Sequence, residues 1–146
     1  MPALTPYLRR VHYYETDQMG IVHHANDIHW FEEARVDMMD QLGFPYRRLE
    51  AEGIASPLLG ITADYKSMVR FDDRLRITVT VAALTASRLT LRYRVEDAET
   101  GLLRTTGETR HCFSGPNGRP LSLKKHCPEL YERLATLLQE AEETEA

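Results

Sequence analysis

The sequence predicts an α+β domain in which an antiparallel sheet packs against one long helix. Between His24 and Leu42, apolar residues recur at steps of three and four, which is the period of a helix. Between positions 56 and 114, apolar and polar residues alternate in successive runs with short links, which predicts consecutive antiparallel strands. A helix followed by a run of strands is typical of the α+β class. The 146 residues, 1–146, are expected to form a single domain.

The N-terminal part predicts a strand and then a turn. Residues 1–6 contain two prolines and are expected to be a loose lead-in. Tyr7 to Tyr14 is rich in aromatic residues, which favours a first strand. The turn runs from Thr16 to Gly20, and Gly20 can take the positive φ that lets a backbone approach a ligand closely.

The long helix from His24 to Leu42 is predicted to be the centre of the domain. Its apolar face is expected to hold Ile28, Phe31, Met38, Met39 and Leu42. Trp30, Ala34 and Val36 lie off this stripe, so the helix should be enclosed by the sheet and by a partner. Arg35 follows Glu32 by three residues, which predicts an ion pair between them. Gly43 is a plausible C-terminal cap.

The remaining elements follow from alternation and from turn residues. Positions 44–53 predict a turn and a short polar helix. The four expected strands span 56–66, 74–83, 89–95 and 102–114. Asn117-Gly118 predicts a turn, and Pro128 opens an amphipathic helix whose acidic end, from Glu140, is expected to fray.

Composition excludes several classes of protein. The formal net charge of −4 gives no electrostatic basis for general nucleic-acid binding. Apolar runs are only a few residues long, so no membrane insertion is expected, and the N-terminus shows no secretion signal, which favours a cytoplasmic location. Cys112 and Cys127 fit no zinc or redox motif and are expected to be reduced, structural thiols.

Asp17 is the first candidate for catalysis because it precedes the start of the long helix by a few residues. Unpaired backbone N–H groups and the positive end of the helix dipole gather at such a start. A carboxylate facing them could attack a carbonyl carbon, or activate water against it, while the amides hold the carbonyl oxygen. The chain has no Gly-x-Ser-x-Gly motif and neither cysteine lies in a catalytic motif, so a carboxylate mechanism is the simplest.

These residues resemble the motif of the 4-hydroxybenzoyl-CoA thioesterase family. The match consists of Asp17, Gly20, Ile21, Val22, His24, Asn26, Trp30, Glu32 and Arg35. Members with histidine at the position of His24 are similar to the Tol-Pal-associated short acyl-CoA thioesterases, whereas others carry tyrosine there. The resemblance extends from about residue 7 to about residue 134. It implies a hot-dog fold, in which a curved sheet wraps the long helix, and acyl-CoA thioesterase activity.

The resemblance also assigns candidate roles. Asp17 would be base or nucleophile, and the His24 backbone N–H would polarise the thioester carbonyl. Tyr14 could hydrogen-bond Asp17 or line the acyl pocket. Substrate contacts are expected from Gly20, Ile21, His23, Lys66, Arg70, Ser87 and Arg88, the basic ones because coenzyme A carries phosphates. No i, i+4 histidine pair occurs, so no metal site is expected.

Some alternatives stay open at this point. The thioester could be carried by acyl carrier protein instead of coenzyme A, or the domain could bind acyl-CoA without catalysis. Coenzyme A would be part of the substrate, and no separate cofactor is expected. Hot-dog proteins are implied to be homodimers or homotetramers, with two sheets joined edge to edge.

Overall fold

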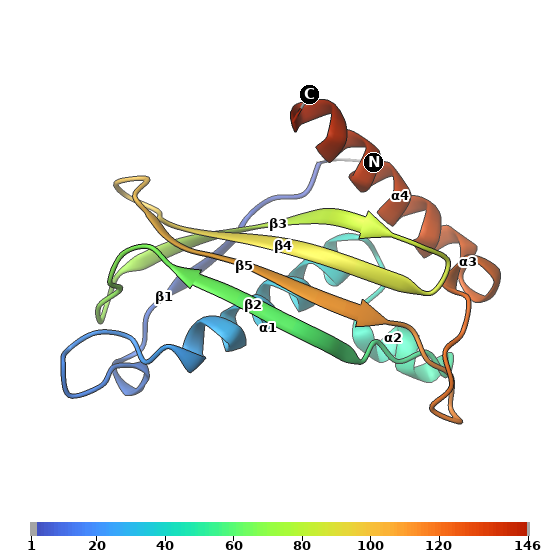
Figure 1. Cartoon of the computed structure of the whole chain (residues 1–146), viewed down its shortest axis with the longest axis horizontal. Coiled ribbons are helices and arrows are strands. Elements are labelled where there is room, and N and C mark those ends of the chain that lie inside the picture. Colours follow the sequence, from blue (N-terminus) through green and yellow to red (C-terminus); the bar gives the residue numbers. More distant parts are fainter. Residues whose placement is uncertain (1–2, 146) are drawn as a thin grey trace.

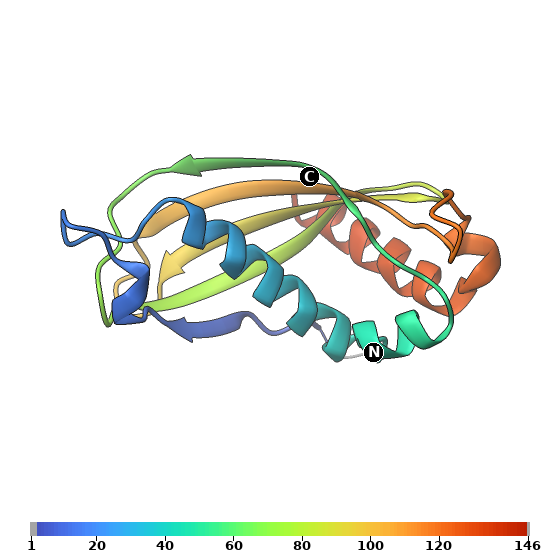
Figure 2. The ribbon, with the colours of Figure 1, turned by 90° about the horizontal axis from the view of Figure 1, so that it is seen from below.

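A five-stranded antiparallel sheet curves around one long helix. The computed structural model describes residues 3–145. The strands are β1 (Tyr7–Arg10), β2 (Leu58–Tyr65), β3 (Arg74–Leu84), β4 (Arg88–Asp97) and β5 (Leu103–Cys112). Their order across the sheet is β1-β3-β4-β5-β2, which leaves β1 and β2 at the edges (Figure 1). Helix α1 (Ala25–Gln41) runs diagonally across one face of the sheet (Figure 2).

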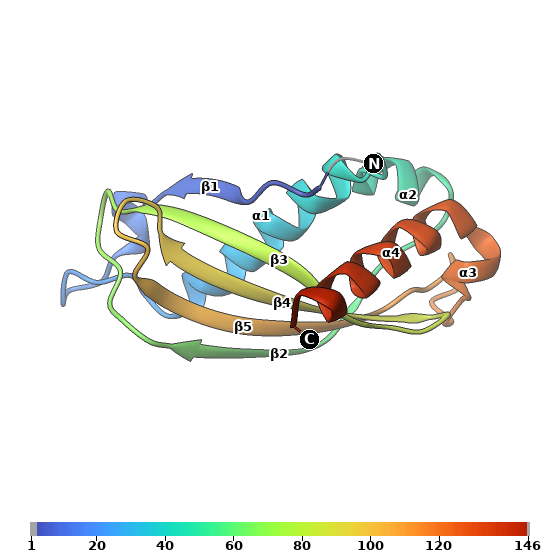
Figure 3. The same ribbon diagram turned by 90° about the horizontal axis from the view of Figure 1, so that it is seen from above.

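The remaining helices lie toward the other end of the sheet from the loop that precedes α1. They are α2 (Tyr46–Ala51), α3 (Leu123–His126) and α4 (Pro128–Glu145). Strand β1 pairs only with the first residues of β3, and helix α4 packs against β3 (Figure 3). Helix α4 therefore covers the part of β3 that β1 does not reach. None of the helices within residues 3–145 is long and apolar enough to cross a membrane.

The core forms where α1 meets the sheet, because β-strand alternation aims every second side chain at the helix. Leu89, Leu91, Tyr93 and Val95 of β4 are buried, while Arg88, Arg92 and Arg94 between them are exposed. Gly107 of β5 allows the closest approach: a Cβ there would lie 2.4 Å from the Phe31 ring. Phe31 itself stacks on Tyr93 with ring centroids 4.5 Å apart.

Most sequence-based boundaries are confirmed within a few residues, but the first strand is not. It ends at Arg10, and Tyr13–Glu15 forms a 3₁₀ helix instead of continuing the strand. The buried Glu15 carboxylate causes this change, because it accepts a hydrogen bond from the His12 backbone N–H at 2.8 Å and folds the chain back. The short helix α3 was not predicted, and α4 continues through Glu140 to Glu145 where fraying was expected.

The buried face of α1 also differs from the predicted stripe. Trp30 and Ala34, which were placed off it, are buried, whereas Ile28 is 37% exposed. The predicted Arg35–Glu32 ion pair is wrong: Glu32 is exposed, and the Arg35 guanidinium donates its Nε hydrogen to the Tyr46 hydroxyl at 2.6 Å. Helical spacing shows neighbours along the same helix, but it cannot show partners from α2. Gly43 does cap the helix, with φ of 84°.

Candidate active site

Asp17 lies in a tight loop that the flanking backbone closes. Thr16 and Val22 pair as an antiparallel bridge, and the Asp17 N–H donates to the Ile21 carbonyl at 2.9 Å. The Gly20 N–H donates back to the Asp17 carbonyl at 3.0 Å, with Gly20 at φ of 76° as predicted. The loop therefore has a defined shape that holds the Asp17 backbone in place.

The Asp17 carboxylate is oriented but remains available. Its Oδ1 accepts a hydrogen bond from the Met19 backbone N–H at 2.8 Å, and the residue is half-buried. No ion pair within residues 3–145 involves it, so its charge is not neutralised by a neighbouring cation. A carboxylate has room for about four hydrogen bonds, so one backbone donor leaves most of its capacity free.

Buried Glu15 anchors this loop to helix α1. Its carboxylate accepts hydrogen bonds from Arg9 Nη1 at 2.6 Å and Trp30 Nε1 at 2.8 Å, and its backbone carbonyl accepts from the Asn26 side chain at 2.9 Å. Burial alone would raise the Glu15 pKa, but the hydrogen bonds from Arg9, His12 and Trp30 outweigh it and lower the pKa. Glu15 therefore stays ionised and fixes where the Asp17 loop begins.

The residue before α1, His24, leaves its backbone N–H free within the part of the chain that the structure describes. The Ala25 N–H is capped by His23 Nδ1 at 3.2 Å, and the Asn26 N–H donates to the His23 carbonyl at 3.0 Å. The His24 N–H has no acceptor within residues 3–145. The His24 carbonyl accepts from the Tyr65 hydroxyl at 2.6 Å, which ties the helix start to the end of β2. The helix dipole favours negative charge at this free N–H.

Asp17 and this helix start line the same cavity. It has a volume of about 440 Å³ and lies between the Asp17 loop, the start of α1, and the chain that leaves β2. Of the predicted site residues, the cavity brings together Asp17, Ile21, His24 and Lys66. Its other lining residues are Met19, Val22, Asp27, Tyr65, Ser67, Met68, Val69 and Thr105. Charged and apolar side chains both line the cavity, which suits a ligand with a polar carbonyl and an apolar tail.

Asp27 is a functional candidate that sequence reasoning missed. It is only 3% exposed, and its Oδ1 accepts a hydrogen bond from the Thr105 hydroxyl at 2.8 Å. Burial raises the Asp27 pKa to about 6, although the Thr105 hydrogen bond acts in the opposite direction. A usable signal was present, because Asp27 precedes Phe31 by four residues and so lies on the buried face of α1.

The other predicted residues lie outside this cavity. Tyr14 is 78% exposed on the 3₁₀ helix and stacks on His12, so it neither bonds Asp17 nor lines the cavity within this chain. His23 caps the helix and stacks on His24 at 4.1 Å. The Arg70 guanidinium lies close to Gly20, 3.9 Å from where a Cβ would be. Ser87 and Arg88 belong to the turn from β3 into β4, which lies at the end of the sheet away from the loop that precedes α1 (Figure 1).

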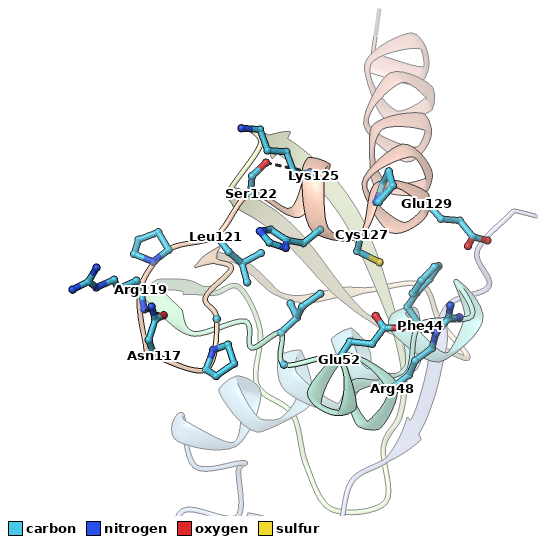
Figure 4. A pocket seen from close by; sticks show the side chains of 17 residues that line it. Phe44, Arg48, Glu52, Asn117, Arg119, Leu121, Ser122, Lys125, Cys127 and Glu129 are labelled. Atoms are coloured by element: carbon cyan, nitrogen blue, oxygen red, sulfur yellow. Dashed lines mark hydrogen bonds and ion pairs between the residues drawn. The ribbon is translucent and has the colours of Figure 1, made fainter.

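A larger cavity, of about 1040 Å³, lies at the opposite end of the molecule between α2, α3 and the loop after β5 (Figure 4). Its charged side chains include Arg48 and Glu52, which neutralise each other at 3.7 Å. None of the predicted catalytic residues lines it. The smaller cavity is therefore the candidate active site, because Asp17 and His24 both line it. Residues 3–145 contain no cluster of histidine, cysteine or acidic residues able to hold a metal ion.

Comparison with known proteins identifies the chain as a thioesterase with a hot-dog fold. The sequence profile described as the thioesterase-like superfamily matches residues 11–134, so the chain belongs to that superfamily. The acyl-CoA thioester hydrolase YbgC of Escherichia coli is 30% identical over 80% of this chain and 87% of its own length.

Solved structures agree with this assignment. The DHNA-CoA thioesterase of Staphylococcus aureus is 27% identical, with a TM-score of 0.87 over 97% of this chain and 95% of that one. A hypothetical protein from Thermus thermophilus is 33% identical, with a TM-score of 0.84 over 92% and 99% of the two chains. The protein is thus a hydrolase with the predicted hot-dog fold.

Proposed function

We propose that the protein hydrolyses acyl-CoA thioesters, with Asp17 as general base or nucleophile and the His24 backbone N–H as the oxyanion donor. The observation that carries the proposal is the shared cavity, which is lined both by Asp17, whose carboxylate accepts one backbone hydrogen bond, and by His24, whose backbone N–H has no acceptor within residues 3–145. The relatives support coenzyme A as the carrier, because YbgC is an acyl-CoA thioester hydrolase and the staphylococcal neighbour is a DHNA-CoA thioesterase.

The chemistry follows from these two groups. As a base, Asp17 removes a proton from water, and the resulting hydroxide attacks the thioester carbon. As a nucleophile, its carboxylate forms an acyl-enzyme anhydride that water then hydrolyses. In both routes, negative charge develops on the carbonyl oxygen, where the His24 N–H and the α1 dipole stabilise it. Collapse of the tetrahedral intermediate breaks the C–S bond, and the thiolate of coenzyme A takes up a proton.

A thiol-release assay over a panel of acyl-CoAs tests the proposal. The panel should contain short aliphatic, long aliphatic and aromatic acyl groups, including 4-hydroxybenzoyl-CoA, because the narrower family resemblance is part of the proposal. The same acyl groups on acyl carrier protein should release thiol more slowly. Faster release from the protein carrier would favour that alternative, and acyl-CoA binding without thiol release would indicate a noncatalytic module.

The proposed assembly is a homodimer joined along β2. This edge strand has no partner on its outer side within residues 3–145, and Leu58, Leu59 and Tyr65 on it are each almost half exposed. Two-fold pairing of β2 with its copy would be antiparallel, so the far end of the partner sheet would come alongside the Asp17 end. Arg88 and Ser87 could then reach coenzyme A phosphates from the second subunit, while Lys66 and Arg70 act from the first.

Subunit mixing tests this shared site. Asp17→Asn and Arg88→Ala dimers should each be impaired, the second mainly through a raised KM. Unfolding and refolding them together produces mixed dimers in which one site has both wild-type residues. Activity above the mean of the two parents supports action across the interface. A mixture that shows only the mean activity, or sedimentation as a monomer at micromolar concentration, contradicts it.

A further inference from the structure

The deep end of the active-site cavity holds a carboxyl group that the hydrolysis mechanism does not use. Asp27 from α1 and Thr105 from β5 are 3% and 1% exposed, whereas Asp17 and His24 are more accessible. All four line the same 440 Å³ cavity. The buried pair therefore lies further from solvent than the groups that would meet the thioester.

Structural needs do not explain why this position is acidic. An acid in the first turn of a helix does favour the dipole, but the surface provides that benefit without burial. No ion pair within residues 3–145 involves Asp27, and the only side chain that hydrogen-bonds its carboxylate there is Thr105. Burying a carboxyl group without a cation is costly, and its raised pKa reflects that cost. The group is thus costly to the fold and still has hydrogen-bonding capacity to spare.

We propose that Asp27, positioned by Thr105, is a specificity-determining residue that accepts a hydrogen bond from the acyl group of the substrate. This inference rests on the proposed function, because it assumes that the acyl group enters this cavity. The fitting acyl groups carry a donor, such as a hydroxyl, at their inner end. An unsubstituted acyl group would desolvate the Asp27 carboxyl group without donating a hydrogen bond to it. Such a substrate should therefore bind less well.

The remaining walls agree with this selection. Met19, Ile21, Val22, Met68 and Val69 provide apolar surface along the cavity. Such a wall binds an alkyl or aryl group without distinguishing whether it carries a hydroxyl. Asp27 and Thr105 are the buried polar side chains among the residues that line this cavity, so we assign the discrimination between those two substrates to this pair.

The test compares kcat/KM for matched substrates that differ by one hydroxyl. Suitable pairs are 4-hydroxybenzoyl-CoA with benzoyl-CoA, and 3-hydroxybutyryl-CoA with butyryl-CoA. For at least one pair, the wild-type enzyme should prefer the hydroxylated member by about 10- to 100-fold, the effect of one unsatisfied buried acceptor. Asp27→Leu, which is similar in shape, should lose most of that preference mainly by gaining activity on the unsubstituted member. Thr105→Val should weaken it less, because the carboxyl remains.

Controls separate this role from a structural one. Asp40→Leu makes the same change at an exposed position of α1 outside the cavity and should leave the ratio unchanged. If Asp27→Leu does not fold, as judged by circular dichroism, Asp27→Asn carries the test. It keeps the shape and an acceptor but loses the charge, so the preference should fall partially.

The outcomes distinguish the two proposals. If the wild-type enzyme hydrolyses no acyl-CoA, the proposed function fails. The specificity role of Asp27 is overturned, while the proposed function stands, if the enzyme hydrolyses acyl-CoA but prefers neither substrate in any pair. It is also overturned if the Asp27 variants lower kcat/KM equally for both substrates of a pair.

Discussion

Polar groups gather in two regions along helix α1, and the two regions differ in how fully these groups are hydrogen-bonded. Around its start, which we call the loop end (residues 12–27), Asp17, the His24 N–H and Asp27 all keep unused hydrogen-bonding capacity. Around its middle, the Arg35 cluster consists of Arg35, Tyr46, Tyr93, Thr109 and His111. There, almost every polar atom is used within the chain. The comparison teaches that burial alone does not mark a functional site. The candidate site is distinguished by a carboxylate and a backbone N–H that line one cavity and keep hydrogen-bonding capacity for a ligand.

The Arg35 cluster shows how completely polar groups can satisfy one another. Arg35 donates to the Tyr46 hydroxyl at 2.6 Å, and the Tyr93 and Thr109 hydroxyls lie 2.7 Å apart. His111 Nε2 lies 2.8 Å from the Thr109 hydroxyl and 3.4 Å from Arg35 Nη1. Because the guanidinium can only donate, Nε2 must accept, so the imidazole is neutral and carries its proton on Nδ1. Nδ1 is the exception: it is buried and has no partner at hydrogen-bond geometry within residues 3–145, although the nearby Ser56 backbone acts to raise the pKa of this histidine.

The largest expected effect is at the loop end. Asp17→Asn keeps the side-chain size and can still accept the Met19 N–H, but it removes the base and nucleophile. Turnover should fall by about 10²–10⁴-fold or more, with KM and thermal unfolding little changed. His24→Ala should lower turnover less than Asp17→Asn does, since the backbone N–H at position 24 remains. Full activity in Asp17→Asn protein prepared without contact with wild-type enzyme would end the assignment.

A second prediction concerns the anchor of the loop end. Glu15→Ala removes the buried ion-pair partner of Arg9, which is 8% exposed and keeps its pair with Glu33, and it removes acceptors from His12 and Trp30. The free energy of unfolding should fall by about 3–5 kcal/mol, as for other broken buried ion pairs. Glu52→Ala is the control, because the Arg48–Glu52 pair is about half exposed and should contribute only about 0–1 kcal/mol.

Denaturant unfolding measures both variants. Similar losses in the two would show that the buried Glu15 network contributes no more than a surface pair. If Glu15→Ala folds at low temperature, its kcat should fall more than its KM rises, because the Asp17 loop loses its fixed starting point.

The sequence could predict the sheet and the catalytic motif for different reasons. Strands β3 and β4 are recognisable because one face of each is buried, so polar and apolar residues alternate. Strand β5 lacks this alternation, since its buried residues include Thr105, Thr109 and His111, and only the turn before it indicates where it starts. Asp17 and the helix start are adjacent in sequence, so a local pattern contains their geometry. Partners that tertiary folding brings together were not visible: Arg35 meets Tyr46 and His111 instead of Glu32, and Thr105 meets Asp27 across 78 residues.

The smallest expected effect is on the pH dependence of the free energy of unfolding, to which the two regions contribute with opposite sign. Burial first, and then the charge of Arg35, lower the His111 pKa to about 4, against about 6.5 in an unfolded chain. The stability that His111 contributes is complete above pH 6.5 and is lost as the pH falls toward 4. The Asp27 pKa is raised to about 6, so acidification from pH 6 toward 4 relieves its cost and stabilises the fold. Each contribution between pH 6.5 and 4.5 should be about 2 kcal/mol, with opposite sign.

Two variants separate these contributions. His111→Gln should retain the Asp27 effect, so its free energy of unfolding should rise on acidification from pH 6.5 to 4.5. Asp27→Asn should retain the His111 effect, so its free energy of unfolding should fall over the same interval. The wild-type protein should lie between them with a shallow dependence, measured by denaturant titration at each pH. This interval lies above the range in which Asp97, with a pKa lowered to about 2 by backbone hydrogen bonds and Arg104, would contribute. If the free energy of unfolding depends on pH in the same way in both variants, neither His111 nor Asp27 has the shifted pKa described above. The contrast between the two regions would then rest on hydrogen bonding alone.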